Sequence, residues 1–282
     1  MNLPRRRIGF VDLNPDNFHA NVYLDLVRGD LRGRGFDVAG VSATDTAAAR
    51  AWSRAKSVPF FDDPSQLDRH VDCYMILAPS NPEAHLALCE TFFPFGKPTY
   101  VDKTFAPDLS TARRIFALAD THHVPMQTSS ALRYTRVQGH VGDVGKANVR
   151  HMITWGAGRS FDEYAIHPLE LLVSCMGPRA TRLMRRGTGS ESQLLIDFTD
   201  GRTGVANVYT NADTPFAATV TTRTSTRHVE VDGTQIFRDL CAAQLDFFES
   251  AQPSIDREES LTIRALLDAA NDPRCLEMFV TL

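Results

Sequence analysis

The chain of 282 residues has no long apolar run and no excess of charge of one sign. No stretch approaches the roughly 18 apolar residues that a membrane helix needs, so the sequence predicts no membrane partner. Lys and Arg number 30 against 34 Asp and Glu, which gives a formal net charge of -4 and excludes a broad basic surface for nucleic acid. The apolar run Ile8 to Val11 is too short for a signal peptide, so we expect a cytoplasmic protein.

Cysteine is also scarce, and the five residues form no CxxC pair: Cys73, Cys89, Cys175, Cys241 and Cys275. This spacing predicts neither a zinc site nor a disulfide framework, and we expect five buried thiols. His, Cys, Asp and Glu form no cluster with the spacing of metal ligands, and the Gly-x-Ser-x-Gly and Walker motifs are lacking. The sequence therefore predicts no metal cofactor.

The first half of the chain alternates strand-like and helix-like runs. The strand-like runs lie at 7–13, 36–42, 71–78, 99–102 and 124–128, and the helix-like runs at 18–29, 46–56, 82–93 and 110–121. This alternation predicts an α/β domain over residues 1–128 with a doubly wound, Rossmann-type parallel sheet. Ligands of such sheets bind beyond the carboxyl ends of the strands, so the residues that follow each strand are the first candidates for chemistry.

The second half changes to strand-like segments, many of them with alternating polarity. These segments lie at 148–155, 180–186, 192–199, 203–210, 217–224 and 228–231, and helices are predicted at 161–175, 237–250 and 260–270. Asp200-Gly201 predicts a tight hairpin turn between two of the strands. We therefore expect residues 129–282 to form an α+β domain with a large, open, mostly antiparallel sheet.

Several local motifs follow one another in a characteristic order. They are Ala78-Pro79-Ser80-Asn81, Gly96-Lys97-Pro98, Val101-Asp102-Lys103, Ser130-Ala131-Leu132-Arg133-Tyr134, Glu163 to Glu170 (EYAIHPLE), and Gln252-Pro253 with Glu258-Glu259-Ser260. Their order and spacing resemble the Gfo/Idh/MocA family of sugar and cyclitol dehydrogenases over nearly the whole chain. The resemblance implies a Rossmann domain followed by a substrate domain whose open sheet pairs with another subunit.

This resemblance implies NAD(P)-dependent hydride transfer on a sugar, cyclitol or related small carbonyl or hydroxyl compound. Lys103 matches a family lysine at the end of the fourth strand, where it orients a substrate hydroxyl and tunes its proton affinity. His167 matches the family's general base, and imidazole suits proton transfer near neutral pH. Glu163 precedes His167 by four residues and is predicted on the same helix face, as is Glu170.

The resemblance also implies two sets of binding residues. Substrate contacts are predicted for Arg133, Tyr164, Trp155 and His19, with a place in the sheet core as the alternative for Trp155 and a helix cap for His19. Cofactor contacts are predicted for Asp12, Asn14, Asn17, Ala43, Ala78, Pro79 and Asp102. Thr104 follows Lys103 where the family has proline, so we expect a trans peptide bond there.

The sequence departs from the family at the glycine-rich turn after the first strand. Asp12, Asn14 and Asn17 stand near the three positions where glycine allows a tight turn, close approach of the pyrophosphate and helix–strand packing. Asn and Asp tolerate positive φ, but the side chain of Asn14 intrudes on the phosphate and the charge of Asp12 repels it. We therefore predict weak or atypical binding of NAD or NADP.

The second strand departs from the family as well. Ala43 stands where an acidic residue ordinarily holds the ribose 2′-hydroxyl, and Asp45 is more simply a helix cap. Acceptance of a 2′-phosphate by nearby polar side chains is the alternative, and it involves Ser42, Thr44 and Arg50.

Three hypotheses about function follow. The first is the NAD(P)-dependent oxidoreductase with a small-molecule substrate. The second is a redox-neutral lyase, isomerase or dehydratase on the same scaffold that has lost or traps the dinucleotide. The third is a non-catalytic binding or assembly subunit. In each case we expect a homo-oligomer, a dimer or tetramer, formed through the C-terminal sheet, with Leu195, Val205 and Val208 on its open face.

Overall fold

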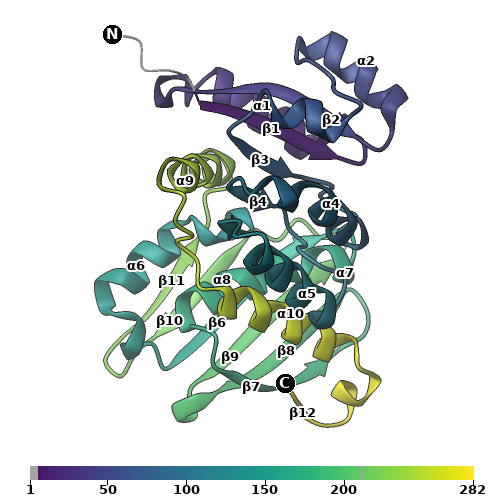
Figure 1. The fold of residues 1–282 in the computed structure, drawn as a ribbon. Helices are drawn as coiled ribbons and strands as arrows, with labels where there is room; N and C mark the ends of the chain where they lie inside the picture. The colour runs from purple at the N-terminus through teal and green to yellow at the C-terminus, as the bar shows by residue number, and fades with distance from the viewer. Residues whose placement is uncertain (1–5, 211) are drawn as a thin grey trace. The chain divides into compact units, whose positions relative to one another are not determined.

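Five parallel strands form the first sheet of the computed structural model, which describes residues 6–210 and 212–282 (Figure 1). The strands are β1 (Arg6–Asp12), β2 (Phe36–Ala43), β3 (Cys73–Ile76), β4 (Thr99–Val101) and β5 (Met126–Gln127). They pair in the order β2-β1-β3-β4-β5, which confirms the predicted Rossmann-type sheet. Their side chains are buried on both faces, as expected for a parallel sheet covered by helices.

Helices connect these strands. They are α1 (Phe18–Arg28), α2 (Thr46–Lys56), α3 (Pro64–Asp68), α4 (His85–Phe92) and α5 (Leu109–Thr121), with 3₁₀ turns at Arg32–Arg34, Pro82–Ala84 and Phe93–Phe95. Asp45 caps α2, since its side chain accepts a hydrogen bond from the N–H of Ala48, and this confirms the simpler interpretation of Asp45.

A sixth helix returns to this unit from late in the sequence. Packing groups Met1–Ser129 with Phe237–Ile255 as unit 1, and Ser130–Ile236 with Asp256–Leu282 as unit 2. Most of α9 (Ile236–Ser250) therefore belongs to unit 1. The division into residues 1–128 and 129–282 placed this helix in the second domain, because a sequence pattern does not show which sheet a helix packs against.

Unit 2 is built on a seven-stranded sheet. Its strands are β6 (His151–Gly158), β7 (Ala180–Arg186), β8 (Glu191–Phe198), β9 (Thr203–Thr210), β10 (Ala217–Thr221), β11 (Thr226–Glu230) and β12 (Val280–Thr281). They pair in the order β11-β10-β6-β9-β8-β7-β12, antiparallel except for the parallel pair of β6 and β9. The predicted hairpin turn is confirmed, since Asp200 and Gly201 have φ of 63° and 66°.

Helices cover one face of this second sheet. They are α6 (Arg136–Val144), α7 (Phe161–Tyr164), α8 (Ile166–Met176) and α10 (Arg257–Asn271), with 3₁₀ turns at Ala131–Arg133, Lys146–Asn148, Thr199–Gly201 and Pro273–Leu276. Figure 1 shows α8 and α10 running along the sheet. Contact with α8 is close at Gly204, where a Cβ would lie 2.9 Å from the side chain of Leu172.

The other face of the sheet carries alternate side chains that are exposed or half-buried. Leu195 and Val205 lie there and pair across β8 and β9, as predicted. Val208 was wrongly placed on this face. It is 1% exposed and lies on the helix-covered side, because residues three apart on a strand point to opposite faces.

All five cysteines are buried and unpaired, which confirms the prediction of buried thiols. No helix within residues 6–210 and 212–282 is long and apolar enough to cross a membrane.

The open sheet face generates a prediction about self-association. We expect the wild-type chain to form a dimer or tetramer and Leu195→Asp, which places a charge on that face, to shift it toward the 31.3 kDa monomer. Light scattering at micromolar concentration measures the mass. Ala117→Asp, at an exposed position on α5, is the matched control. A monomeric wild-type protein would contradict this prediction.

Candidate functional site

A buried carboxylate closes the turn after β1. Asp12 is the last residue of the strand and is 1% exposed. Its Oδ1 accepts the backbone N–H groups of Leu13 at 2.7 Å, Asn14 at 3.3 Å and Ala78 at 3.2 Å, and its Oδ2 accepts the side-chain amide of Asn17 at 2.8 Å. Burial raises the pKa of Asp12 to about 6, and these hydrogen bonds oppose that rise.

The rest of the turn is held by asparagine side chains. Oδ1 of Asn14 accepts the N–H of Asp16 at 2.9 Å. Asn17 is the N-cap of α1, and its Oδ1 accepts the N–H of Ala20 at 3.0 Å. The third position of the glycine pattern thus serves as a cap rather than as the contact point between helix and strand.

The end of β2 lacks the group that would hold a ribose. Ala43 closes the strand, and the carboxylate of Asp45 is engaged as the cap of α2. Arg50, the candidate for a 2′-phosphate, instead pairs with Asp62 at 3.3 Å and lies over the ring of Phe60.

The residues around the turn therefore do not fit a dinucleotide held in the usual way. In that mode the pyrophosphate needs free backbone N–H groups in the turn and at the helix N-terminus. Here Asp12 and Asn17 use N–H groups at both places.

A histidine–aspartate pair lies at the end of β4, beside Lys103. Nδ1 of His19 donates a hydrogen bond to Oδ2 of Asp102, and both residues are buried. Burial alone would raise the pKa of Asp102, but the charge of His19 and its hydrogen bond hold that pKa below the usual value. The ammonium of Lys103 acts in the same direction. His19 is thus not the cap of α1, since Asn17 has that role.

Loop contacts fix the position of Lys103. Its Nζ donates a hydrogen bond to the carbonyl of Pro79 at 3.2 Å. This bond joins the loop after β4 to the loop after β3. His85 ties the same loops together through the carbonyls of Leu77 and Phe105. The peptide bond between Lys103 and Thr104 is cis, so the prediction of a trans bond was wrong. That prediction considered the residue type alone and not the surrounding loop.

The second histidine of interest, His167, lies in unit 2 near the start of α8. Its Nδ1 lies 2.8 Å from the hydroxyl of Ser130, and its ring contacts those of Tyr164 and Phe216 edge-on. Gly158 on β6 makes room for this group, because a Cβ there would lie 1.9 Å from the ring of Tyr164. The rings of Tyr164 and His167 are therefore in contact.

Glu163 lies in α7, one helical turn before His167, and is half-buried. Ala165 between the two helices keeps helical backbone angles, so the path from Glu163 to His167 stays helical. Glu170 was expected on the same face but pairs instead with Arg133.

Arg133 lies in a buried ion network rather than presenting its charge to a ligand. Its Nε contacts Glu170 and its Nη1 contacts Glu259, each at 2.5 Å. Lys146 adds a third contact, to Glu259 at 2.7 Å. Burial raises the pKa of Glu170, and the charge of Arg133 opposes that rise. The network occupies Nε and Nη1 of Arg133, and its substrate contact stays a prediction.

Trp155 is not brought to the His167 group. It lies on β6 among the half-buried side chains of the open face, and its ring contacts His228 on β11. Thr154 and Gly156, its neighbours in sequence, face α8 and contact Pro168. Alternation along the strand places Trp155 on the opposite face.

Sequence reasoning missed the partners of the two histidines. Ser130 was part of a quoted motif but had no assigned role, and Asp102 was assigned to the cofactor rather than to His19. The signal available was the position of His19 in the first turn of α1, close to the carboxyl ends of the strands.

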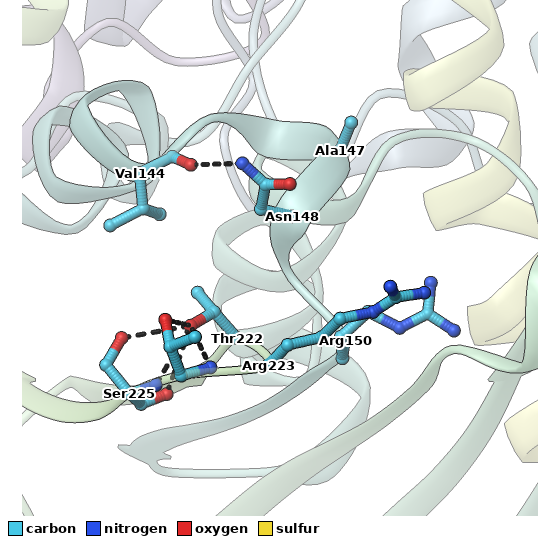
Figure 2. A pocket seen from close by; sticks show the side chains of 8 residues that line it. Val144, Ala147, Asn148, Arg150, Thr222, Arg223 and Ser225 are labelled. Carbon is cyan, nitrogen blue, oxygen red and sulfur yellow. Dashed lines mark hydrogen bonds between the residues drawn. The ribbon is translucent and has the colours of Figure 1, made fainter.

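A pocket in unit 2 contains none of these residues. Figure 2 shows Arg150 and Arg223 beside it, with the hydroxyls of Thr222 and Ser225 bonded to each other at 3.0 Å. No polar side-chain atom of the residues that line this pocket is buried without a hydrogen-bond partner, and Arg150 donates to the carbonyl of Asp200. Within the described ranges, no group of three or more His, Cys, Asp or Glu residues is placed to hold a metal ion.

Comparison with known proteins identifies the first half of the chain. Residues 17–130 match the family model described as an oxidoreductase family with an NAD-binding Rossmann fold. Over these residues the chain matches the Rossmann domain of the Gfo/Idh/MocA family. No curated protein matches the sequence.

Solved structures share the Gfo/Idh/MocA fold over the whole length. The myo-inositol dehydrogenase of Lactobacillus casei, in complex with NAD(H) and myo-inositol, is 14% identical with a TM-score of 0.84, over 99% of this chain and 97% of that one. The apo scyllo-inositol dehydrogenase of the same organism is 12% identical with a TM-score of 0.83, over 100% and 99%. An Agrobacterium radiobacter oxidoreductase, in complex with NAD+, L-tartaric acid and magnesium, is 16% identical with a TM-score of 0.77, over 98% of each chain. At these identities the likeness shows the fold.

The buried carboxylate of Asp12 predicts a pH-dependent stability. The pKa of Asp12 in the folded chain is about 6, above the value of 3.8 for a solvated Asp. Its stabilising contribution to the free energy of unfolding is therefore fully present below pH 4 and is lost as pH rises through 6. We compare the free energies of unfolding of Asp12→Asn and wild type. As pH rises from 4 to 7.5, we expect their difference to shift by about 1–3 kcal/mol in favour of Asp12→Asn. Urea unfolding across this range measures the difference. The exposed Asp16→Asn is the control, and a pH-independent difference for Asp12→Asn would contradict the prediction.

The buried network of Arg133 predicts a large loss on truncation. Arg133→Met leaves Glu170 and Glu259 buried without their main counter-charge, so we expect a loss of about 3–5 kcal/mol in free energy of unfolding. Arg179→Met, which removes an exposed pair with Asp200, is expected to cost about 1 kcal/mol or less. Urea titration of both variants checks the contrast, and equal losses would show that the burial of Arg133 has no special effect.

Proposed function

We propose that the protein is an enzyme that acts on a sugar, cyclitol or related small hydroxyl or carbonyl compound. Membership of an oxidoreductase family supports NAD(P)-dependent hydride transfer as the first candidate reaction. The observation that carries the proposal is the presence of a positioned proton-handling group in each unit. Lys103 stands beside the His19–Asp102 pair, and His167 stands beside Ser130.

In unit 1 we assign Lys103 and His19 to the substrate hydroxyl. Lys103 is 9% exposed, and one of its three N–H donors goes to the carbonyl of Pro79. The ammonium is held by this bond and has donors left to hydrogen-bond a hydroxyl and stabilise an alkoxide. The carboxylate of Asp102 orients the ring of His19 through Nδ1, which leaves Nε2 as the atom that exchanges a proton.

In unit 2 we assign His167 as a general acid–base residue. Ser130 contacts Nδ1, and the rings of Tyr164 and Phe216 both contact the imidazole edge-on. A ring fixed in this way exchanges a proton through a defined atom, which is what an efficient base requires. Tyr164 extends the group with a phenol that is able to hydrogen-bond a polyhydroxylated substrate. We assign Glu163, one helical turn before His167, as a residue that positions the imidazole.

A second candidate reaction is redox-neutral: a lyase, isomerase or dehydratase reaction on the same compounds. A base removes the proton from a carbon next to a carbonyl, and an acid returns a proton to the departing oxygen or to another carbon. Asp12 favours this candidate, because its carboxylate fills the turn that a dinucleotide needs. Retention of both Lys103 and His167 disfavours a non-catalytic subunit.

Substitution of the proton-handling residues tests the proposal. We expect His167→Asn and Lys103→Met each to lower turnover by about 10²- to 10⁴-fold with folding intact, and Glu163→Gln to cost less. A panel of inositols, hexoses and their keto derivatives is assayed with NAD(H) and NADP(H) by absorbance, and without them by NMR.

The control for this test is His123→Asn, an exposed residue whose positive φ suits asparagine. Circular dichroism verifies the fold of every variant. Near-normal turnover in both the His167 and Lys103 variants would overturn the assignment.

A further inference from the structure

The turn after β1 contains an anion that belongs to the chain itself. Three backbone N–H groups converge on Oδ1 of Asp12, from Leu13, Asn14 and Ala78. Two of them belong to the turn, and the third comes from the loop after β3. A carboxylate that receives several N–H donors is bound in the way that Rossmann turns bind a phosphate.

The second oxygen of this carboxylate extends the arrangement to the helix. Oδ2 accepts the amide of Asn17, whose own Oδ1 accepts the N–H of Ala20 in the first turn of α1. Asn17 therefore links the anion to the helix N-terminus, which ordinarily faces a pyrophosphate. The carboxylate and the cap together use donors that a dinucleotide requires.

Binding of a dinucleotide in this turn costs free energy whether the carboxylate of Asp12 moves or stays. Moving Asp12 aside breaks four hydrogen bonds to a group that is 1% exposed. Leaving it in place sets a pyrophosphate against a buried negative charge of the same sign. No cation in the turn offsets this repulsion, because residues 12–19 include no Lys or Arg.

We propose that the carboxylate of Asp12 takes the place of the dinucleotide pyrophosphate, so that the wild-type chain does not hold NAD(H) or NADP(H) as its family does. This inference rests on the proposed function in one respect: it chooses between hydride transfer and the redox-neutral reaction. It selects the redox-neutral one, in which Lys103 and His167 act without a hydride carrier.

Binding measurements on charge and size variants test this inference. Wild type, Asp12→Asn and Asp12→Gly are titrated with NADH and NADPH by fluorescence and calorimetry. Asp12→Asn removes the charge at nearly constant shape, and Asp12→Gly also removes the side chain. Asp16→Asn, two residues beyond the turn's donors and exposed, is the matched control. Denatured wild-type protein is also examined by mass spectrometry for a trapped dinucleotide.

We expect no trapped dinucleotide and a wild-type Kd weaker than about 1 mM, with Asp12→Gly at least about tenfold tighter and Asp16→Asn unchanged. Asp12→Asn is expected to fall between wild type and Asp12→Gly. Wild-type binding at about 10 μM or tighter, or a trapped dinucleotide, overturns the inference, as does a folded Asp12→Gly that binds no better than wild type. If one variant fails to fold, the wild-type titration and the other variant decide.

The two proposals fail separately. Tight binding of NADH by wild type leaves the roles of Lys103 and His167 intact and restores hydride transfer as the reaction. Normal turnover in the Lys103 and His167 variants removes the proposed function and leaves the binding result for Asp12 unaffected.

Discussion

The hydrogen bonds to the carboxylate of Asp12 hold together the functional edge of unit 1. They join the end of β1 to the loop after β3 through Ala78, and to the start of α1 through Asn17. Because α1 also carries His19, the same bonds help to set the histidine against Asp102 at the end of β4. One buried charge thus connects three strands and a helix, in a place where related folds rely on glycine and a bound ligand.

Each unit contains a cluster of buried charges that compensate one another. Asp102 is matched by His19 and Lys103 in unit 1, and in unit 2 Arg133 is matched by two carboxylates. Such clusters are costly to desolvate and destabilising to break, so they fix geometry more than they add stability. Asp12 differs, because only neutral amide and backbone donors surround it, and burial raises its pKa although these hydrogen bonds oppose the rise.

Sequence patterns predicted the elements well and their long-range partners poorly. The β-α alternation of unit 1 and the Asp200-Gly201 turn are local signals, and both were correct. Val208 was misplaced because it lies three residues after Val205 and so faces the opposite side of the strand. Helix α9 was misplaced because a helical pattern does not encode which unit the helix packs against. The Lys103 and His167 positions came from motif resemblance, whereas contacts such as Ser130 with His167 span 37 positions and leave no periodic signal.

The return of α9 to unit 1 has a consequence for how the chain is made. Contacts of this helix with earlier residues include Arg34 with Asp246, and Phe18 with Phe237. All of residues 130–236 therefore leave the ribosome before unit 1 receives its last helix, although domains synthesised first usually finish folding first. During translation, the surface of unit 1 that α9 covers therefore stays without its packing partner until α9 is synthesised. Because both units are discontinuous in sequence, no single cut in the chain releases either unit intact.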